Sequence, residues 1–256
     1  MPWSHAGLVF AALAIFPAFG NSARAAGTVV EVDASIVLAA DVSRSINDDE
    51  FALQRQGYAS AITSPRLMDA IKSGPHGAIA LCFVEWAGEF EQKVVVEWTL
   101  VRDNADARKV SDALLTAPRS FVGRTAIGSA IDFAAGLNAE SAIQAERHII
   151  DVSGDGTSNQ GRAVADARDD AVKAGAVING LSIFNQRAAA MSGYLALHTN
   201  PPGGLAKYYR DNVIGGPGAF VLPIDNFGSF GDAMVQKLLQ EISQVPPSRI
   251  SRRRAM

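Results

Sequence analysis

The apolar positions of this chain fall into two patterns that alternate along the sequence. Runs rich in apolar and β-branched residues, which are typical of buried strands, occupy residues 34–40, 77–88, 89–101, 147–156, 176–184 and 218–224. Segments with the apolar spacing of helices lie at 46–63, 104–117, about 125–137, 161–175 and 230–244. Strands that alternate with helices predict βαβ units, and therefore a mainly parallel sheet covered by helices on both faces.

The order of these segments also predicts the architecture. The runs 77–88 and 89–101 follow each other almost directly, so we expect an antiparallel hairpin there. The fold class predicted is α/β: a single three-layer, doubly wound sheet, mostly parallel with one antiparallel edge strand. The region 185–218 is the least regular, because it holds "NPPGG" and "IGGPG", and we expect loops and insertions in it.

The first helix carries its own start signal. Asn47 is placed as an N-cap and Glu50 follows three residues later, which is the spacing of a capping box. Carboxylates at this position favour the positive end of a helix. The acidic cluster Asp48, Asp49 and Glu50 is therefore interpreted as a helix start and not as a metal site.

Composition narrows the class of protein. The chain has 256 residues, of which 48% are hydrophobic and 19% charged, as expected for one globular domain with a large core. The formal charge is −3 and the body of the chain has no basic patch, so no nucleic-acid partner is expected. Cys82 is the only cysteine, which excludes an intramolecular disulfide; its apolar surroundings predict a buried, inert thiol.

The two ends of the chain differ from its body. Residues 1–26 are predicted to be a signal peptide, with an apolar stretch from 7 to 19 and an A-x-A pattern before cleavage after Ala25 or Ala26. No Lys or Arg precedes that stretch, and an uncleaved anchor is the alternative. We expect a domain over 27–245, a disordered basic tail over 246–256, and a periplasmic or secreted protein with no membrane span after signal removal.

Five polar residues at the ends of predicted strands or before a predicted helix suggest one common site. Asp41, Ser43 and Ser45 come after the first strand in "DVSRS", Thr125 precedes a helix in "GRTAIGSA", and Asp155 ends a strand in "SGDG". In an open parallel sheet, the carboxyl ends of the strands face one crevice, so these side chains should meet if their strands are neighbours. All five are oxygen donors, which suit a divalent cation; Mg²⁺ is preferred here, with Mn²⁺ or Ca²⁺ as alternatives.

Each of these elements has a simpler explanation when taken alone. D-x-S-x-S could be a strand end with local turns, Thr125 could cap a helix, and "GDG" could be a turn. Only their conjunction, in order and at strand ends, predicts a metal site. Two carboxylates and three hydroxyls would leave the ion incompletely neutralised, so that it could accept a carboxylate from another protein.

The same residues carry a resemblance to a known family. "DVSRS", the threonine of "GRTAIGSAI" and the aspartate of "SGDG" resemble the metal-ion-dependent adhesion site of von Willebrand factor A domains, over roughly residues 34–245. The "SGDG" departs from the "TDG" of many members. More narrowly, "DVSRSI", "FALQRQGY" and "VSGDG" resemble exported bacterial von Willebrand A-like proteins of unknown function, the DUF1194 type.

The resemblance implies roles for the five residues. Ser43 and Ser45 would bind the metal through their hydroxyls, and Thr125 would bind it directly or through water. Asp41 and Asp155 would contact it mostly through water. An open coordination position would take an acidic residue of a protein partner. The function that follows is an exported, metal-dependent protein-binding module for adhesion or assembly.

Two other functional classes stay open at the level of sequence. A metal-dependent hydrolase of a phosphate or ester is the enzymatic alternative, with Arg44 and Arg124 flanking the site as anion-binding groups. No G-x-S-x-G, G-x-G-x-x-G or P-loop motif is present, so we expect no enzyme. The other alternative is a structural subunit whose metal only stabilises the loops.

Several further residues were considered for the site. Asp151 lies about 13 Å back along the strand from Asp155, too far to bind the same ion, whereas Ser153 could lie behind the ligands. Asn185 and Arg187 follow a strand end and are candidates for the rim. The three histidines outside the leader are interpreted as structural: His76, His148 and His198.

Overall fold

A computed structural model describes residues 1, 30–191 and 193–243. The predicted signal peptide, apart from Met1, and the predicted basic tail lie outside the described residues.

The centre of the fold is a six-stranded sheet with the order β4-β3-β2-β6-β7-β8. Its strands are β2 (Ala34–Asp41), β3 (Ile79–Trp86), β4 (Gln92–Val101), β6 (His148–Gly154), β7 (Ala176–Ile183) and β8 (Val221–Ile224). Neighbouring strands are parallel except for the hairpin of β3 and β4, which is antiparallel and places β4 at one edge. This confirms the predicted sheet, including its single antiparallel edge strand.

The burial of the strands follows their position in the sheet. Every residue of β2 and β3 is buried, because helices cover both faces of the central strands. Most residues of the edge strands β4 and β8 are at least partly exposed, and only Val96, Val101 and Ile224 are buried. The apolar runs of β2 and β3 therefore lie in the centre of the sheet, where solvent does not reach them.

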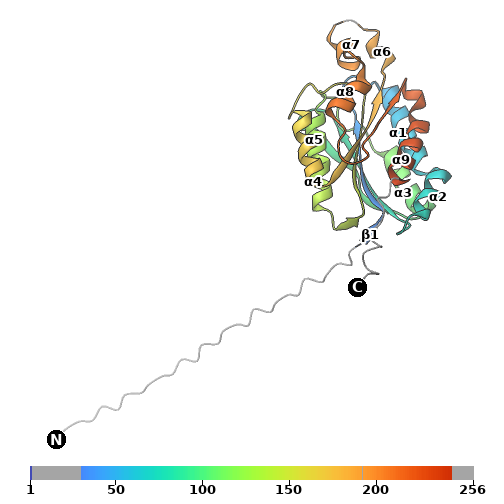
Figure 1. Ribbon diagram of the computed structural model, residues 1–256, viewed down its shortest axis with the longest axis vertical. Coiled ribbons are helices and arrows are strands. Elements are labelled where there is room, and N and C mark those ends of the chain that lie inside the picture. Colours follow the sequence, from blue (N-terminus) through green and yellow to red (C-terminus); the bar gives the residue numbers. More distant parts are fainter. Residues whose placement is uncertain (2–29, 192, 244–256) are drawn as a thin grey trace.

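Helices form the two outer layers (Figure 1). One face is covered by α1 (Asp48–Ile62), α2 (Pro65–Ser73), α3 (Asn104–Thr116) and α9 (Phe230–Ser243), which pack on residues such as Leu38 and Phe83. The other face is covered by α4 (Ile127–Glu140), α5 (Val164–Lys173) and α8 (Leu205–Asn212), which pack on residues such as Val37 and Trp86. The predicted three-layer architecture is thus confirmed.

Helix α1 begins as its sequence predicts and packs tightly against α9. The Asn47 side chain accepts from the Glu50 backbone N–H at 2.8 Å, and Glu50 Oε2 accepts from the Asn47 N–H at 2.8 Å, which completes the capping box. Farther along α1, a Cβ on Gly57 would lie 2.5 Å from Phe230 Cδ1. Only a glycine at this position lets the two helices approach so closely.

A buried charged cluster, formed by Lys237, Asp151 and Glu241, joins α9 to the middle of β6. Lys237 Nζ lies 2.8 Å from Asp151 Oδ1 and 2.6 Å from Glu241 Oε1, and all three side chains are fully buried. Asn179 of β7 donates a further hydrogen bond to Glu241 Oε1 at 2.8 Å. The ammonium group therefore stabilises two carboxylates that have no access to water.

The structure adds elements that the sequence patterns did not predict. Helix α2 follows α1 almost directly, and a small parallel pair joins β1 (Val30–Val32) to β5 (Ile143–Ala145). The region 185–218, for which we expected loops and insertions, contains α6 (Gln186–Ala189), α7 (Tyr194–Thr199) and α8. A short 3-10 turn over Phe227–Ser229 precedes α9.

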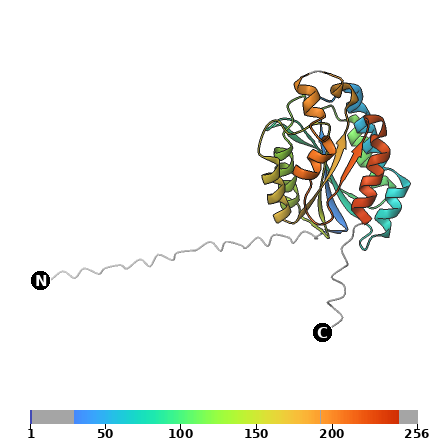
Figure 2. The same ribbon diagram turned by 45° about the horizontal axis from the view of Figure 1, so that its top comes forward.

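The molecule has two distinct ends. The parallel strands all end on the side where α6 and α7 project from the sheet (Figures 1 and 2). Strand β1 and the end of α9 lie at the opposite side. Within the described residues, no helix has both the length and the apolar character needed to cross a membrane.

Candidate metal centre

The loop after β2 turns the D-x-S-x-S side chains toward one another. Asp41 is the last residue of β2, and its Oδ1 accepts a hydrogen bond from the backbone N–H of Ser43 at 2.7 Å. The hydroxyl oxygens of Ser43 and Ser45 lie 3.2 Å apart. The loop thus gathers three oxygen-bearing side chains at the carboxyl end of a central strand.

Pairing of β2 with β6 brings Asp155 to the same place, and the loop before α4 adds Thr125. Ser45 Oγ donates to Asp155 Oδ1 at 2.6 Å, and Thr125 Oγ1 donates to Ser43 Oγ at 3.2 Å. All five side chains are buried. Every residue predicted for the site therefore belongs to one hydrogen-bonded group, which we call the oxygen cluster: Asp41, Ser43, Ser45, Thr125 and Asp155.

The two carboxyl groups of the oxygen cluster carry an electrostatic cost. Burial, followed by repulsion from Asp155, raises the pKa of Asp41 to about 8, although hydrogen bonds from Ser43 act in the other direction. Burial also raises the pKa of Asp155 to about 6, against the lowering effect of hydrogen bonds from Ser45 and Asn185. Without a cation, burial therefore shifts both carboxyl groups toward the protonated form, and Asp41 more than Asp155.

The donor set fits a hard divalent cation. Asp41 Oδ2 is buried and has no hydrogen-bond partner among the described residues. A buried carboxylate oxygen without a partner is costly, and a cation is the kind of group that would satisfy it. In the described part of the chain, no three His, Cys, Asp or Glu side chains gather as in a zinc or multi-carboxylate site. Carboxylate and hydroxyl oxygens suit Mg²⁺, Mn²⁺ or Ca²⁺ instead.

Close packing supports the oxygen cluster from below. A Cβ on Gly154 would lie 2.5 Å from the Tyr209 hydroxyl and 2.9 Å from Asp41 Oδ2. Glycine at this position allows β6 to pass directly beneath the carboxylate of the neighbouring strand. The "SGDG" sequence, which departs from the pattern of many related domains, thus has a steric reason in this fold.

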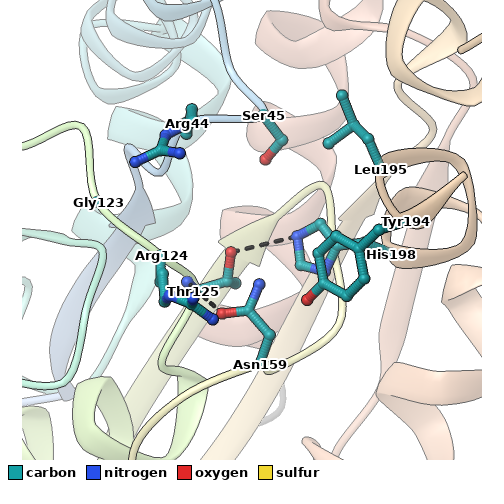
Figure 3. A pocket seen from close by; sticks show the side chains of 9 residues that line it. All are labelled: Arg44, Ser45, Gly123, Arg124, Thr125, Asn159, Tyr194, Leu195 and His198. Carbon is teal, nitrogen blue, oxygen red and sulfur yellow. Dashed lines mark hydrogen bonds between the residues drawn. The ribbon is translucent and has the colours of Figure 1, made fainter.

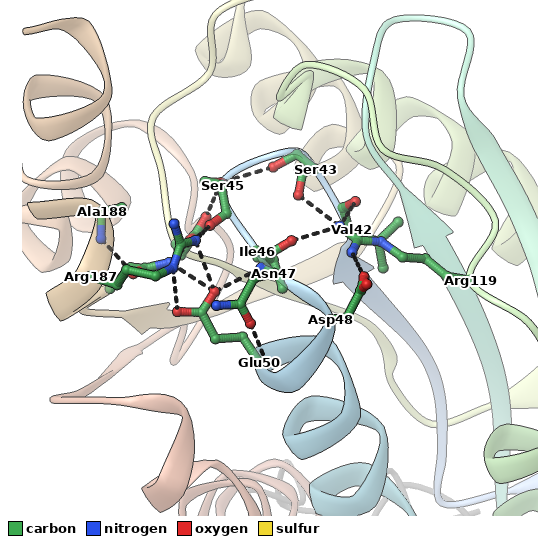
Figure 4. A network of polar contacts seen from close by, with 12 residues as sticks. Val42, Ser43, Ser45, Ile46, Asn47, Asp48, Glu50, Arg119, Arg187 and Ala188 are labelled. Carbon is green, nitrogen blue, oxygen red and sulfur yellow. Dashed lines mark hydrogen bonds and ion pairs between the residues drawn. The ribbon is translucent and has the colours of Figure 1, made fainter. Parts of the chain in front are cut away.

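Arg119, which the sequence patterns did not single out, contacts the loop after β2 (Figure 4). Its Nη2 donates to the backbone carbonyls of Val42, Ser43 and Ile46 at 2.8, 3.0 and 2.9 Å. Its Nη1 lies 3.2 Å from the carboxylate of Asp48. One guanidinium therefore fixes the backbone that carries the two serines.

Replacement of Arg119 by Met should weaken metal binding without removing any ligand of the oxygen cluster. The loop carbonyls would lose their common donor, and we expect the affinity for Mn²⁺ to fall by about tenfold or more. Isothermal titration calorimetry with Mn²⁺ measures this directly. Arg162→Met is the charge-matched control, because Arg162 pairs with surface carboxylates instead. Equal Mn²⁺ affinities in the two variants would contradict the role of Arg119.

The residues after β7 contact the oxygen cluster from the other side. Asn185 Nδ2 donates to Asp155 Oδ2 at 2.7 Å and to the Ser45 carbonyl at 3.1 Å. Arg187 also donates to the Ser45 carbonyl, and its Nη2 lies 3.2 Å from Glu50 Oε2. Both were candidates for the rim; Asn185 is buried and orients the carboxyl group of Asp155, whereas Arg187 ties the loop to α1.

His198 of α7 is a hydrogen-bonding neighbour of the oxygen cluster. Its Nε2 lies 3.2 Å from Thr125 Oγ1, and its Nδ1 lies 3.2 Å from Thr157 Oγ1. Burial lowers its pKa. A Cβ on Gly156 would collide with the ring, so the glycine after Asp155 makes room for it. His198 therefore packs beside Thr125 and forms hydrogen bonds there. The spacing of the two residues in the sequence does not indicate that they are neighbours.

The other candidate residues have partners outside the oxygen cluster. The Ser153 hydroxyl lies 2.8 Å from that of Tyr58, and Asp151 belongs to the buried charged cluster of α9. His148 Nδ1 lies 2.8 Å from Ser35 Oγ, near the start of β2. Cys82 is buried, and burial raises the pKa of its thiol to about 12, as expected for an inert group.

A cavity of about 510 Å³ opens next to the oxygen cluster (Figure 3). Ser45 and Thr125 form part of its wall, so the hydroxyl side of the cluster faces an accessible space. The remaining wall is formed by Arg44, Gly123, Arg124, Asn159, Tyr194, Leu195 and His198. Two of the five residues of the oxygen cluster thus lie at the wall of the cavity, while the two aspartates are fully buried.

The sheet order, the helical layers and the oxygen cluster at the carboxyl end of β2 together define a von Willebrand factor A-like domain. The chain belongs to the family described as protein of unknown function (DUF1194), which it matches over residues 31–246. Comparison with the sequences of curated proteins gave no match.

Solved structures of the same fold include matrix and adhesion proteins. Proximal thread matrix protein 1 from the mussel byssus is similar with a TM-score of 0.56 and 15% identity, over 83% of this chain and 49% of that chain. A second structure of that protein has a "zinc occupied MIDAS motif". The pilus adhesin SpaC from Lactobacillus rhamnosus GG has a TM-score of 0.59 and 12% identity, over 86% of this chain and 31% of that chain.

A von Willebrand factor type A protein from Catenulispora acidiphila is also similar, with a TM-score of 0.54 and 12% identity, over 82% of this chain and 43% of that chain. The chain therefore spans about half the length of the mussel protein and less of the adhesin. These likenesses establish the fold.

Proposed function

We propose that this protein is an exported, metal-dependent protein-binding module, and not an enzyme. The oxygen cluster would hold a divalent cation, with Mg²⁺ preferred and Mn²⁺ or Ca²⁺ as alternatives. Ser43, Ser45 and Thr125 would supply neutral oxygens, and the two aspartates would supply the negative charge. When bound, the ion would provide an electrophilic position for a carboxylate of a partner protein.

One observation carries this proposal: Ser45 and Thr125 form part of the wall of the cavity, whereas Asp41 and Asp155 are fully buried and do not line it. A cation at the hydroxyls would be reachable from solvent but only partly neutralised, because neutral oxygens withdraw little of its charge. Such an ion binds an incoming carboxylate strongly and with a defined direction.

The leader sequence supports export, and proteins with the same fold support the class of partner. The apolar leader and its A-x-A pattern predict translocation to the periplasm or beyond. Among proteins with this fold, one is described as a thread matrix protein of the mussel byssus and another as a pilus adhesin. An adhesion or assembly role for this chain is consistent with both.

Binding of a labelled, end-blocked peptide with a single aspartate tests the proposal. Fluorescence anisotropy should detect binding with Mn²⁺ present, and we expect affinity to fall by about tenfold or more in EDTA. The same loss is expected when the peptide carries asparagine, or when Asp155→Asn replaces the wild-type protein. Binding that persists unchanged in EDTA would refute capture of a carboxylate by a metal.

A further inference from the structure

Two arginines beside the oxygen cluster, Arg44 and Arg124, have no acidic partner in the part of the chain that the structure describes. Arg44 stands between the two serines, Arg124 precedes Thr125, and both are exposed and line the cavity (Figure 3). The Arg44 backbone N–H donates to the Gly123 carbonyl at 3.0 Å, so the two loops that carry the arginines are held side by side. Within the described residues, neither guanidinium forms an ion pair or a side-chain hydrogen bond, whereas nearby Arg119 and Arg187 both do.

This arrangement places two arginines without an ion pair among the described residues at one side of the cavity. The carboxylate of Glu91 lies beside Gly123, where it accepts a hydrogen bond from the Gly88 N–H at 2.8 Å and forms no ion pair with either guanidinium. The side chains of Asp41 and Asp155 are fully buried, so they do not project between the two exposed guanidinium groups. A guanidinium presents its donors in a fixed fork that matches a carboxylate. An anionic group that enters the cavity could therefore accept hydrogen bonds from two guanidinium groups, which belong to neighbouring loops.

The rim of the cavity is apolar on the opposite side. Tyr194 and Leu195 of α7 line this side; Tyr194 is 64% exposed, and its ring stacks on His198 with centroids 5.7 Å apart. Leu197, three residues after Tyr194 in the same helix, is 63% exposed, and Met191 after α6 is half exposed. Exposed apolar and aromatic side chains around a charged pocket indicate a protein-binding surface, because a small dianion would leave them uncovered.

We propose that the partner presents an extended segment with two acidic side chains and an adjacent apolar one. One carboxylate lies at the metal, the second lies between Arg44 and Arg124, and the apolar side chain packs on Tyr194 and Leu197. This inference rests on the proposed function, because the first carboxylate is the one captured at the oxygen cluster. The second carboxylate supplies selectivity for acidic segments over isolated aspartates.

The test compares end-blocked peptides that carry one aspartate or two, with glycine spacers of increasing length, in the presence of Mn²⁺. For wild type, the best two-acid peptide should bind about tenfold more tightly than the one-acid peptide. This ratio should fall to about one in Arg44→Gln/Arg124→Gln. It should persist in Arg66→Gln/Arg108→Gln, a matched control in which two exposed arginines of α2 and α3 are neutralised.

The outcomes separate this inference from the function on which it rests. Metal-dependent binding of the one-acid peptide with no gain at any spacing, or a gain that survives Arg44→Gln/Arg124→Gln, would overturn the second anion site alone. Absence of metal-dependent binding for every peptide would overturn both. Succinate that binds as tightly as the best peptide would identify a small diacid as the ligand and overturn the peptide assignment.

Discussion

Saturating Mg²⁺ or Mn²⁺ should raise the midpoint of thermal unfolding of this protein by about 5–10 °C. A ligand that binds only the folded state at about one hundred times its dissociation constant stabilises that state by about 2.7 kcal/mol. For a domain of this size, each kcal/mol shifts the midpoint by about 2–4 °C. The effect has a physical source in the oxygen cluster, where two buried carboxyl groups lie close together with one oxygen unsatisfied.

The pH dependence of this effect has a definite sign. Burial and the neighbouring Asp155 raise the pKa of Asp41 from its usual 3.8 to about 8, so the folded, metal-free protein holds a proton that the unfolded chain has lost. Its free energy of unfolding should therefore fall as pH rises through this window, by roughly 1.4 kcal/mol per pH unit at most. A cation replaces the proton, so its stabilising effect should grow from about pH 5 to about pH 8.

Two variants separate metal binding from general stability. Ser43→Ala removes one oxygen donor and should reduce the metal-induced shift. Asp155→Asn removes a buried charge, so its metal-free form should be at least as stable as wild type, while its response to metal should disappear. A wild-type midpoint that does not move with any divalent cation would show that the cluster is only a hydrogen-bonded strand end.

Lys237→Met should lower the free energy of unfolding by about 3–5 kcal/mol, which corresponds to a fall in the thermal midpoint of about 6–20 °C. Methionine fills a similar volume, so the loss comes from charge and not from a cavity. Burial already raises the pKa of Asp151 to about 7, and Lys237 is the group that opposes this. Without the ammonium, Asp151 and Glu241 would repel each other in a site that excludes water.

Urea denaturation followed by circular dichroism measures this loss, with Lys173→Met as the matched control. Lys173 lies exposed in the last turn of α5, and its replacement should change stability by no more than about 0.5 kcal/mol. The deficit of Lys237→Met should also increase with pH, because Asp151, whose pKa burial already raises, would then ionise without its ammonium partner. A cost equal to that of the control would mean that the cluster contributes nothing to stability.

Local signals were sufficient to predict the oxygen cluster. Asp41, Ser43 and Ser45 follow an apolar run directly, and Asp155 ends another, so their meeting requires only that β2 and β6 are neighbours. The capping box of Asn47 and Glu50 is likewise contained in four consecutive residues. Such features depend only on where a strand ends or a helix begins, and a short sequence pattern is enough to predict both.

Residues whose role depends on packing between distant segments could not be predicted in the same way. Arg119 contacts carbonyls more than seventy positions earlier, and His198 reaches Thr125 only because α7 folds back over the sheet. Lys237 and Glu241 have the spacing of an exposed helix pair, and only the docking of α9 on β6 buries them. The apolar spacing does not separate helix α2 from α1, although Pro65 stands in the first turn of α2, because almost no loop divides the two helices.

The placement of β1 and the end of α9 opposite the oxygen cluster has a practical consequence for assembly. A molecule held through either of these elements would project its cavity outward, away from the point of attachment. Several copies arrayed on one support could then engage a repetitive partner together, and weak single contacts would add up to durable attachment. When the protein is immobilised on a sensor surface through either element, its cavity should accordingly stay accessible to a partner.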